Sequence, residues 1–281
     1  MSILKNYDII LMDLWGVIYD GIHLYDGAVE TLKKLKQLNK KVIFLSNVPR
    51  RSSTIEKMLL GFGIDKSLYF NIITSGEFVY HSLHKSKNFG KKYFYLGSPA
   101  SEEVILNVKD YERVSNAKDA DFSILAGTKG ETGTTDYYEE ALALSKEAIK
   151  YNLLLLCTNP DKTSITKCGE IHPCSGKIAE KYEESGGKVF YFGKPHKEFY
   201  EYALEGITNL ESVLAIGDSL ANDIRGANSI EINSVLVSSG VHRHHLEIKL
   251  GEQPHKDVLQ ALFEKYSTKP TYVVSLLKDL L

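Results

Sequence analysis

The chain has 281 residues, which is enough for one large domain or two domains of ordinary size. Hydrophobic residues make up 43% of the sequence and charged residues 25%, a composition typical of a globular protein with a buried core. The 34 basic and 36 acidic side chains give a net charge of −2, which excludes a general attraction to nucleic acid or to anionic membranes.

Three further features concern the cellular location. No apolar run approaches the ~20 residues that a membrane-spanning helix needs. The segment from Met1 to Tyr7 lacks the charged and then apolar layout of a signal peptide. The three cysteines, an odd number in a chain of this length, indicate a reducing compartment rather than a disulfide framework. We therefore expect a cytoplasmic protein without a membrane partner.

The first element in the chain is a short apolar run from Ile9 to Leu14, interrupted by Asp13. Its unbroken apolar character predicts a strand buried on both faces of a parallel sheet. Asp13 then lies at the carboxyl end of that strand, where open α/β sheets bind their ligands. A carboxylate there is costly unless it is paired, bound to metal or used chemically. Taken alone, Asp13 is equally compatible with a turn or a helix cap.

The next segments predict a strand–helix–strand unit. Apolar residues at helical spacing indicate a helix over 28–38, and 42–45 reads as a second buried strand. That strand ends in Ser46 and Asn47, and a further helix runs from 52 to 61. Ser46 alone is compatible with an ordinary hydroxyl at a strand end, but its expected place beside Asp13 suggests a shared site.

The middle of the chain alternates between predicted strands and helices. Strands are expected at 72–76, 93–97, 121–126 and 153–157, and helices at 77–83, 98–108 and 136–150. We interpret the segment from roughly 77 to 189 as a second α/β unit inserted into the first. This interpretation gives a discontinuous domain of residues 1–76 and 190–281 and an inserted domain of residues 77–189.

The last third of the chain returns to the first unit. A strand at 187–192 leads directly into Gly193-Lys194-Pro195-His196, and a strand at 213–217 ends in Asp218, with Asp223 close behind. A last strand at 234–237 and two helices, at 258–266 and 272–281, complete the predicted elements. Three histidines occupy the loop at 240–245, and because adjacent side chains point apart, we interpret it as a solvated loop rather than a metal site.

Polar side chains thus follow several predicted strands: Asp13, Ser46, Lys194, and Asp218 with Asp223. The carboxyl ends of parallel strands gather at one edge of a sheet, so these side chains are expected to converge. Carboxylates suit Mg²⁺, a hard cation that prefers oxygen ligands and substrate phosphates. A lysine helps to neutralise phosphate charge, and one carboxylate remains available to attack phosphorus.

At this point the chain resembles the haloacid dehalogenase-like (HAD) superfamily over essentially its whole length. The four motifs of that family correspond to Met12-Asp13-Leu14-Trp15-Gly16-Val17, Ser46-Asn47, Gly193-Lys194-Pro195, and Gly217-Asp218-Ser219 through Asp223. The segments 73–76 and 158–161, together with the insertion between the second and third motifs, are similar to class IIA of the family. The resemblance implies a Rossmann-like parallel-sheet core with an inserted α/β cap domain.

The resemblance also implies the roles of individual residues. Asp13 is the expected nucleophile, Ser46 is expected to hold the transferring phosphoryl group with help from the Asn47 backbone, and Lys194 is expected to stabilise charge. These assignments describe a phosphatase that forms an aspartyl-phosphate from a small phosphorylated metabolite.

The expected cofactor is Mg²⁺. Its implied ligands are Asp13, the backbone carbonyl of Trp15, Asp218 and Asp223, the last through water or by orienting Lys194. The cap is expected to shape the pocket for the leaving group, and relatives of this class suggest a homodimer formed through the cap.

Trp15 departs from the family pattern, because phosphatases of the family carry a second Asp at this position. That Asp protonates the leaving group and later deprotonates water, a contribution typically worth ~10²–10⁴-fold. Asp20, His23 and His172 are candidates to replace it. Three hypotheses remain: a phosphatase whose acid is supplied elsewhere or is not needed, a phosphotransferase or C–P or C–X hydrolase, and a phosphometabolite-binding protein that has lost turnover.

Overall fold

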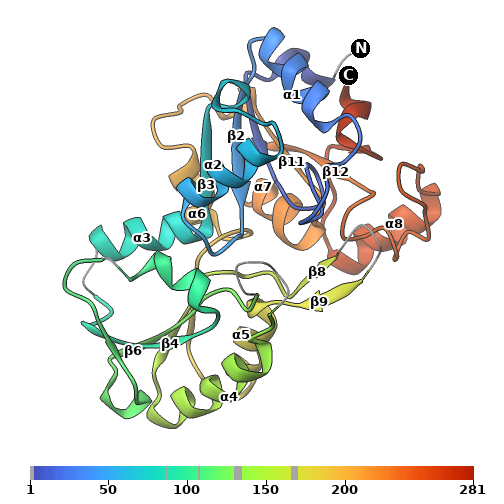
Figure 1. Ribbon diagram of the computed structural model, residues 1–281. Coiled ribbons are helices and arrows are strands. Elements are labelled where there is room, and N and C mark those ends of the chain that lie inside the picture. Colours follow the sequence, from blue (N-terminus) through green and yellow to red (C-terminus); the bar gives the residue numbers. More distant parts are fainter. Residues whose placement is uncertain (1–2, 86–87, 107, 130–134, 166–169) are drawn as a thin grey trace.

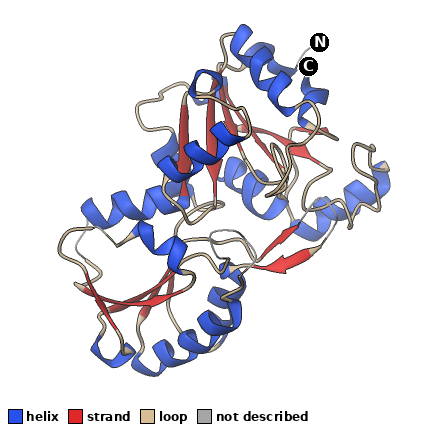
Figure 2. Cartoon of the chain, viewed as in Figure 1, coloured by secondary structure: helices blue, strands red, loops and turns tan. Residues whose placement is uncertain are grey.

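The apolar runs of the sequence form the strands of two separate parallel sheets, each flanked by helices (Figures 1 and 2). The computed structural model describes residues 3–85, 88–106, 108–129, 135–165 and 170–281. We call the six-stranded sheet and its helices the large lobe, and the five-stranded sheet and its helices the small lobe. The predicted α/β fold with parallel sheets is confirmed.

The sheet of the large lobe has the strand order β13-β12-β11-β1-β2-β3, and all neighbouring strands are parallel. Its strands are β1 (Ile9–Met12), β2 (Lys41–Ser46), β3 (Asn71–Thr74), β11 (Val213–Gly217), β12 (Asn233–Val237) and β13 (Tyr272–Val274). From β1 the chain first builds one side of the sheet through β2 and β3, and later builds the other side through β11. The carboxyl end of β1 is therefore the topological switch point of the sheet.

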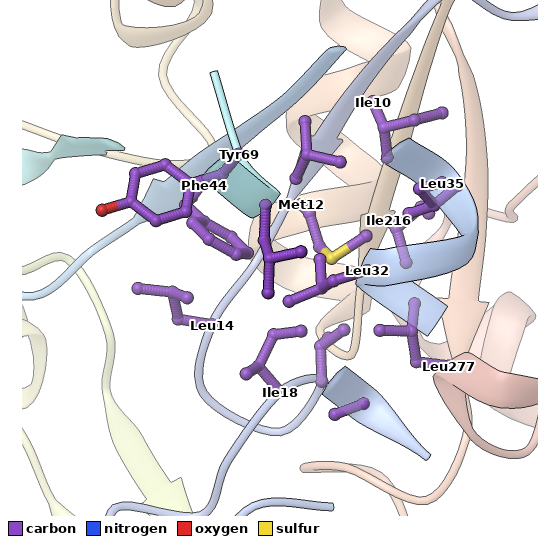
Figure 3. Packing of buried hydrophobic residues seen from close by; sticks show 14 of the residues in the cluster. Ile10, Met12, Leu14, Ile18, Leu32, Leu35, Phe44, Tyr69, Ile216 and Leu277 are labelled. Carbon is purple, nitrogen blue, oxygen red and sulfur yellow. The ribbon is translucent and has the colours of Figure 1, made fainter. Parts of the chain in front are cut away.

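Helices cover both faces of this sheet because its side chains alternate in direction. The helices of the large lobe are α1 (Ala28–Gln37), α2 (Ser52–Gly61), α6 (Lys197–Ala203), α7 (Arg225–Ser229) and α8 (Lys256–Tyr266). Ile10, Met12 and Phe44 pack in one cluster with Leu32 of α1 (Figure 3). Leu11 belongs to the cluster on the opposite face, which includes residues of α6 and α7. Both faces of β1 are thus buried, as the apolar run predicted.

The small lobe repeats this arrangement around a sheet of order β10-β7-β6-β4-β5. Its strands are β4 (Lys92–Leu96), β5 (Glu112–Val114), β6 (Phe122–Leu125), β7 (Leu154–Cys157) and β10 (Val189–Tyr191). Its helices are α3 (Ser75–Lys85), α4 (Tyr138–Ala148) and α5 (Ser175–Glu184), and a small antiparallel hairpin pairs β8 (Thr163–Ile165) with β9 (Ile171–Pro173). The domain limits at 76/77 and 189/190 stay a prediction, and β10 crosses the second of them.

The predicted helix at 272–281 is wrong. Residues 272–274 form β13, which pairs with β12 at the edge of the sheet, and a short 3-10 turn follows at Leu277–Leu280. The helix was predicted because four apolar residues have helical spacing: Val273, Leu276, Leu277 and Leu280. Pairing with β12 satisfies the backbone of the first three residues instead, and Leu277 and Leu280 are buried in the large-lobe core.

Other differences lie in the small lobe. The predicted helix at 98–108 is a 3-10 helix over Pro99–Val104, and β5, the β8–β9 hairpin and α5 were not predicted. These strands have only three residues each, too few for a periodic pattern to reveal them.

In the described part of the chain, no helix combines the length and the apolar character needed to cross a membrane.

Phe44 tests the packing of the large-lobe core. Its side chain is 0% exposed and lies 5.3 Å from Tyr69 between ring centroids. Phe44→Ala is expected to lower the free energy of unfolding by about 3–5 kcal/mol, because it removes buried apolar surface and leaves a cavity. The measurement is urea denaturation followed by circular dichroism.

Phe70 is the matched control, because its side chain is 63% exposed. Phe70→Ala should change the free energy of unfolding by less than about 1 kcal/mol. Equal losses for the two variants would contradict the packing of β2 described above.

Candidate active site

The carboxyl ends of β1, β2 and β11 lie side by side, and each is followed by a polar residue. Met12 pairs with Phe44 and with Ile216, so Asp13 continues between the ends of the two neighbouring strands. The backbone N–H of Asp13 donates to the Ile216 carbonyl at 2.8 Å. Asp13, Ser46 at the end of β2, and Asp218 after β11 are all buried, although open strand ends usually expose such side chains.

Lys194 joins two of the predicted carboxylates. Its Nζ lies 2.7 Å from Asp13 Oδ1 and 2.7 Å from Asp223 Oδ1, and only 3% of its side chain is exposed. Burial alone would lower the pKa of Lys194, but the carboxylates of Asp13 and Asp223 raise it above its ordinary value. The two buried acids therefore favour the charged form of Lys194.

The carboxylates outnumber this single cation. Ligand oxygens of Asp13, Asp218 and Asp223 all lie within 4.8 Å of one another. Burial, together with the charges of Asp223 and Asp161, raises the pKa of Asp13 to about 7 against the opposing effect of Lys194. Burial, together with the charges of Asp13 and Asp223, also raises the pKa of Asp218 well above its usual value. The cluster thus has an excess of negative charge that a cation would relieve.

The donor set fits a hard divalent cation, because the converging ligand atoms are carboxylate oxygens.

Glycine residues beside the cluster leave space for the carboxylate of Asp218. A Cβ on Gly16, whose φ is +81°, would lie 1.9 Å from Asp218 Oδ2. A Cβ on Gly240 would lie 2.2 Å from the same oxygen. Asp218 is therefore enclosed by two loops that lack side chains at the points of contact.

Backbone N–H groups fix the two acids that follow β11. Asp218 Oδ2 accepts from the N–H of Val241 at 2.7 Å, and Asp223 Oδ2 accepts from the N–H of Ser219 at 3.0 Å. Asp223 belongs to a π-helical turn, Leu220–Ile224, which is a frequent feature of functional sites. Asp223 is thus held through both oxygens, by Lys194 on Oδ1 and by Ser219 on Oδ2, whereas the backbone N–H of Val241 holds Asp218 through Oδ2.

The histidine loop is solvated only in part: His244 and His245 are exposed as predicted, whereas His242 is only 3% exposed. Its Nε2 accepts from the N–H of Leu220 at 2.9 Å, at the start of the turn that holds Asp223. Burial, with His245 and Lys265 nearby, lowers the pKa of His242 to about 3, so the ring stays neutral and keeps its acceptor. The sequence did not predict this hydrogen bond, because it depends on how the loop packs against the turn in the folded protein.

Asn47 holds the backbone of Lys194 from both sides. Its Oδ1 accepts from the N–H of Lys194 at 2.7 Å, and its Nδ2 donates to the carbonyl of Lys194 at 3.0 Å. The side chain of Asn47 therefore links the end of β2 to the lysine loop, whereas the sequence suggested a role only for its backbone. The hydroxyl of neighbouring Ser46 accepts from the N–H of Val48 at 3.3 Å.

Asp161 was not among the predicted site residues. It follows β7 in the small lobe, and its Oδ1 accepts from Asn47 Nδ2 at 2.8 Å and from Asn222 Nδ2 at 2.7 Å. Burial raises the pKa of Asp161, and the charge of Lys194 lowers it in part. The only sequence signal was the polar run Thr158-Asn159-Pro160-Asp161 at a strand end. The small lobe thus contributes a carboxyl group to the cluster in the large lobe.

Trp15 brings no acid to this cluster. Its ring makes an edge contact with Tyr19 at 5.6 Å between centroids, and a Cβ on Gly21 would lie 2.3 Å from the indole. The tryptophan thus packs within the loop between β1 and α1. The metal-binding role of its carbonyl stays a prediction.

Comparisons with known proteins agree with this fold. Two family models described as haloacid dehalogenase-like hydrolase match residues 10–109 and 87–230, and a third, described as HAD-hydrolase-like, matches residues 191–280. The sugar-phosphatase AraL of Bacillus subtilis is 28% identical over 247 residues, which cover 87% of this chain and 85% of that protein. The D-glycerol 3-phosphate phosphatase of Mycobacterium tuberculosis is 26% identical over 86% of this chain, which spans only 65% of that relative's length.

Two solved structures share the whole architecture. The p-nitrophenyl phosphatase from Archaeoglobus fulgidus has a TM-score of 0.74 and 25% identity, with 98% of each chain covered. The glycerol phosphate phosphatase from Mycobacterium tuberculosis in complex with magnesium has a TM-score of 0.71 and 23% identity, with 100% of this chain and 78% of that one covered. Since one family model alone spans more than half of the sequence, the chain belongs to the haloacid dehalogenase-like hydrolases.

Proposed function

We propose that this hydrolase is a Mg²⁺-dependent phosphatase that acts on a small organic phosphate through an aspartyl-phosphate intermediate. One observation supports the proposal above the others: Lys194 lies 2.7 Å from Asp13, and two more carboxylates lie beside this pair. Relatives whose names specify sugar phosphatase and glycerol 3-phosphate phosphatase activity point to the same chemistry.

Asp13 has the properties of the nucleophile. It lies at the switch point of the sheet, where a ligand enters from the carboxyl ends of the strands. Its backbone is fixed by β11, and its carboxylate is oriented by Lys194, so one oxygen is free to attack phosphorus. Attack forms a bond between Asp13 and phosphorus while the bond to the leaving oxygen breaks.

Charge stabilisation comes from the neighbours of Asp13. Lys194 is expected to neutralise charge on the phosphoryl oxygens, and the Ser46 hydroxyl, one residue beyond the end of the apolar part of β2, is expected to donate to one of them. Asn47 contributes by holding the backbone of Lys194.

Asp13, Asp218 and Asp223 are the residues that would hold Mg²⁺. A bound Mg²⁺ would polarise the phosphoryl group and neutralise the excess negative charge of the cluster. The magnesium complex of the structurally similar glycerol phosphate phosphatase supports this choice of metal. The small lobe, as the cap, is proposed to enclose the leaving group, and a homodimer formed through the cap stays a prediction.

Asp13→Asn tests the nucleophile. The variant should lose hydrolysis of alkyl, aryl and acyl phosphates on the order of 10⁴-fold or more, because an amide oxygen cannot form the covalent intermediate. The measurement is phosphate release with Mg²⁺ across the substrate panel, with glycerol added in parallel as an acceptor to detect phosphotransfer.

Asp8→Asn serves as the control, because Asp8 has an exposed carboxylate immediately before β1. It should retain full activity. If Asp13→Asn kept its activity, the proposed site would be wrong. If the unmodified protein were inert toward every substrate but still bound phosphate compounds, the binding-protein hypothesis would replace the phosphatase.

Mg²⁺ itself should stabilise the protein, because it relieves repulsion among buried carboxylates. At a concentration about 100 times its Kd, bound Mg²⁺ adds about 2.7 kcal/mol, which corresponds to a rise in Tm of roughly 5 °C. Asp218→Asn should require at least roughly tenfold more Mg²⁺ for the same rise. Differential scanning fluorimetry with a Mg²⁺ titration gives both quantities.

Removal of the metal with EDTA should reverse the rise in Tm of the unmodified protein. Asp8→Asn should respond to Mg²⁺ as the unmodified protein does, since its carboxylate lies outside the cluster. An unchanged Mg²⁺ response of Asp218→Asn would remove Asp218 from the proposed ligand set.

A further inference from the structure

Cleavage of an alkyl phosphate requires a proton for the leaving oxygen, because an alkoxide is a poor leaving group. Trp15 cannot supply that proton. Asp20 does not face the cluster as a free acid, since its Oδ1 accepts from the N–H groups of Ile22 at 2.9 Å and His23 at 2.7 Å within its own turn. His23 itself is exposed in that turn.

His172 is also an unsuitable donor. It lies on β9 of the small-lobe hairpin, with a partly exposed ring 3.8 Å from the carboxylate of Glu170. The candidates suggested by the sequence therefore leave the role of proton donor open.

Asp161 is a better placed acid. Its carboxyl is anchored to Asn47, next to Ser46, and to Asn222, next to Asp223. Its charge contributes to the electrostatic environment of Asp13, and that of Lys194 acts on Asp161 in turn. The residue as a whole is partly exposed, while its carboxyl group is surrounded closely enough for burial to raise its pKa.

The direction from which Asp161 approaches is the second argument. In phosphoryl transfer the attacking and leaving oxygens lie roughly in line on opposite sides of phosphorus. Asp13 attacks from the large lobe, so the leaving oxygen points toward the small lobe. Asp161 belongs to the segment between β7 and β8 of the small lobe and reaches the cluster through Asn47 and Asn222.

We propose that Asp161 is the general acid and base of this hydrolase and replaces the carboxyl group that is missing at position 15. The proposal rests on the phosphatase function proposed above. Both anchoring hydrogen bonds end on Oδ1, and among the described residues no hydrogen bond is recorded for Oδ2. Oδ2 is thus the oxygen that exchanges the proton with the leaving group.

The proton balance is closed over two half-reactions. In the first, an Asp13 oxygen bonds to phosphorus, the bonding pair of the leaving P–O bond goes to the leaving oxygen, and the proton of Asp161 converts that oxygen to an alcohol. In the second, the Asp161 carboxylate takes a proton from water, the water oxygen bonds to phosphorus, and the bonding pair returns to Asp13 as phosphate departs. Asp161 ends protonated, as it began.

Burial raises the pKa of Asp161 above the ordinary value of an aspartate, although the charge of Lys194 and the hydrogen bond from Asn47 act in the opposite direction. The amides of Asn47 and Asn222 hold Oδ1 without needing the proton. An asparagine at 161 keeps an oxygen acceptor for both amides but cannot transfer a proton. Asp161→Asn therefore separates proton transfer from positioning.

The experiment compares Asp161→Asn with the unmodified protein on an alkyl phosphate and on 4-nitrophenyl phosphate. Turnover of the alkyl phosphate should fall ~10²–10⁴-fold. With 4-nitrophenyl phosphate, whose leaving group needs no proton, stopped-flow absorbance should show a burst of about one nitrophenolate per active site. Slow steady-state release should follow, because hydrolysis of the aspartyl-phosphate still needs a base.

Asp119→Asn, which changes an exposed carboxylate of the small lobe, is the control and should match the unmodified protein. If Asp161→Asn fails to fold by circular dichroism, Asp161→Ser, which also lacks a carboxyl group, takes its place. Turnover of the alkyl phosphate within threefold of the unmodified protein would overturn the proposal. A loss on both substrates without a burst would also overturn it.

These outcomes are distinct from a failure of the proposed function. An unmodified protein that hydrolyses no phosphate, or an Asp13→Asn variant that stays active, would overturn the phosphatase and this inference together. An active protein with an inactive Asp13→Asn variant and an unimpaired Asp161→Asn variant would overturn the role of Asp161 alone.

Discussion

The pairing of Lys194 with Asp13 and Asp223 is the interaction on which the rest of the structure depends. Buried charges are stable only when they are paired and hydrogen-bonded. Here the pairing is incomplete, because Asp218 adds a third carboxylate to a single ammonium. The protein keeps this costly arrangement where it would bind a cation and a phosphate, while apolar packing on both faces of the sheet provides stability.

The topology explains how residues so distant in sequence reach one site. Asp13, Ser46 and Asp218 follow three neighbouring parallel strands, so the sheet itself sets their spacing. The remaining contacts come from loops that are tied to one another by side chains, above all by Asn47, which holds the lysine loop and also reaches the small lobe. Loss of the Asn47 side chain would therefore disturb the position of Lys194, its pairing with Asp13 and the contact with the small lobe.

Much of this site could be predicted from the sequence because strand ends are visible as apolar runs that stop at polar residues. Asp13, Ser46, Lys194, Asp218 and Asp223 were all found in this way. Asp161 and His242 were not, because the contact of Asp161 with Asn47 joins residues more than a hundred positions apart and His242 is buried only by the packing of its loop. The strand β13 was missed since three residues at a sheet edge resemble the first turn of a helix.

Gly16 shows how far such long-range constraints extend. The carboxylate of Asp218 occupies the space that any side chain at position 16 would need, and the backbone there has a conformation that favours glycine. The residue type three positions after the nucleophile is thus dictated by an acid some two hundred residues later in the chain. Any search for new activities in this scaffold by mutation must therefore treat these two positions as a single unit.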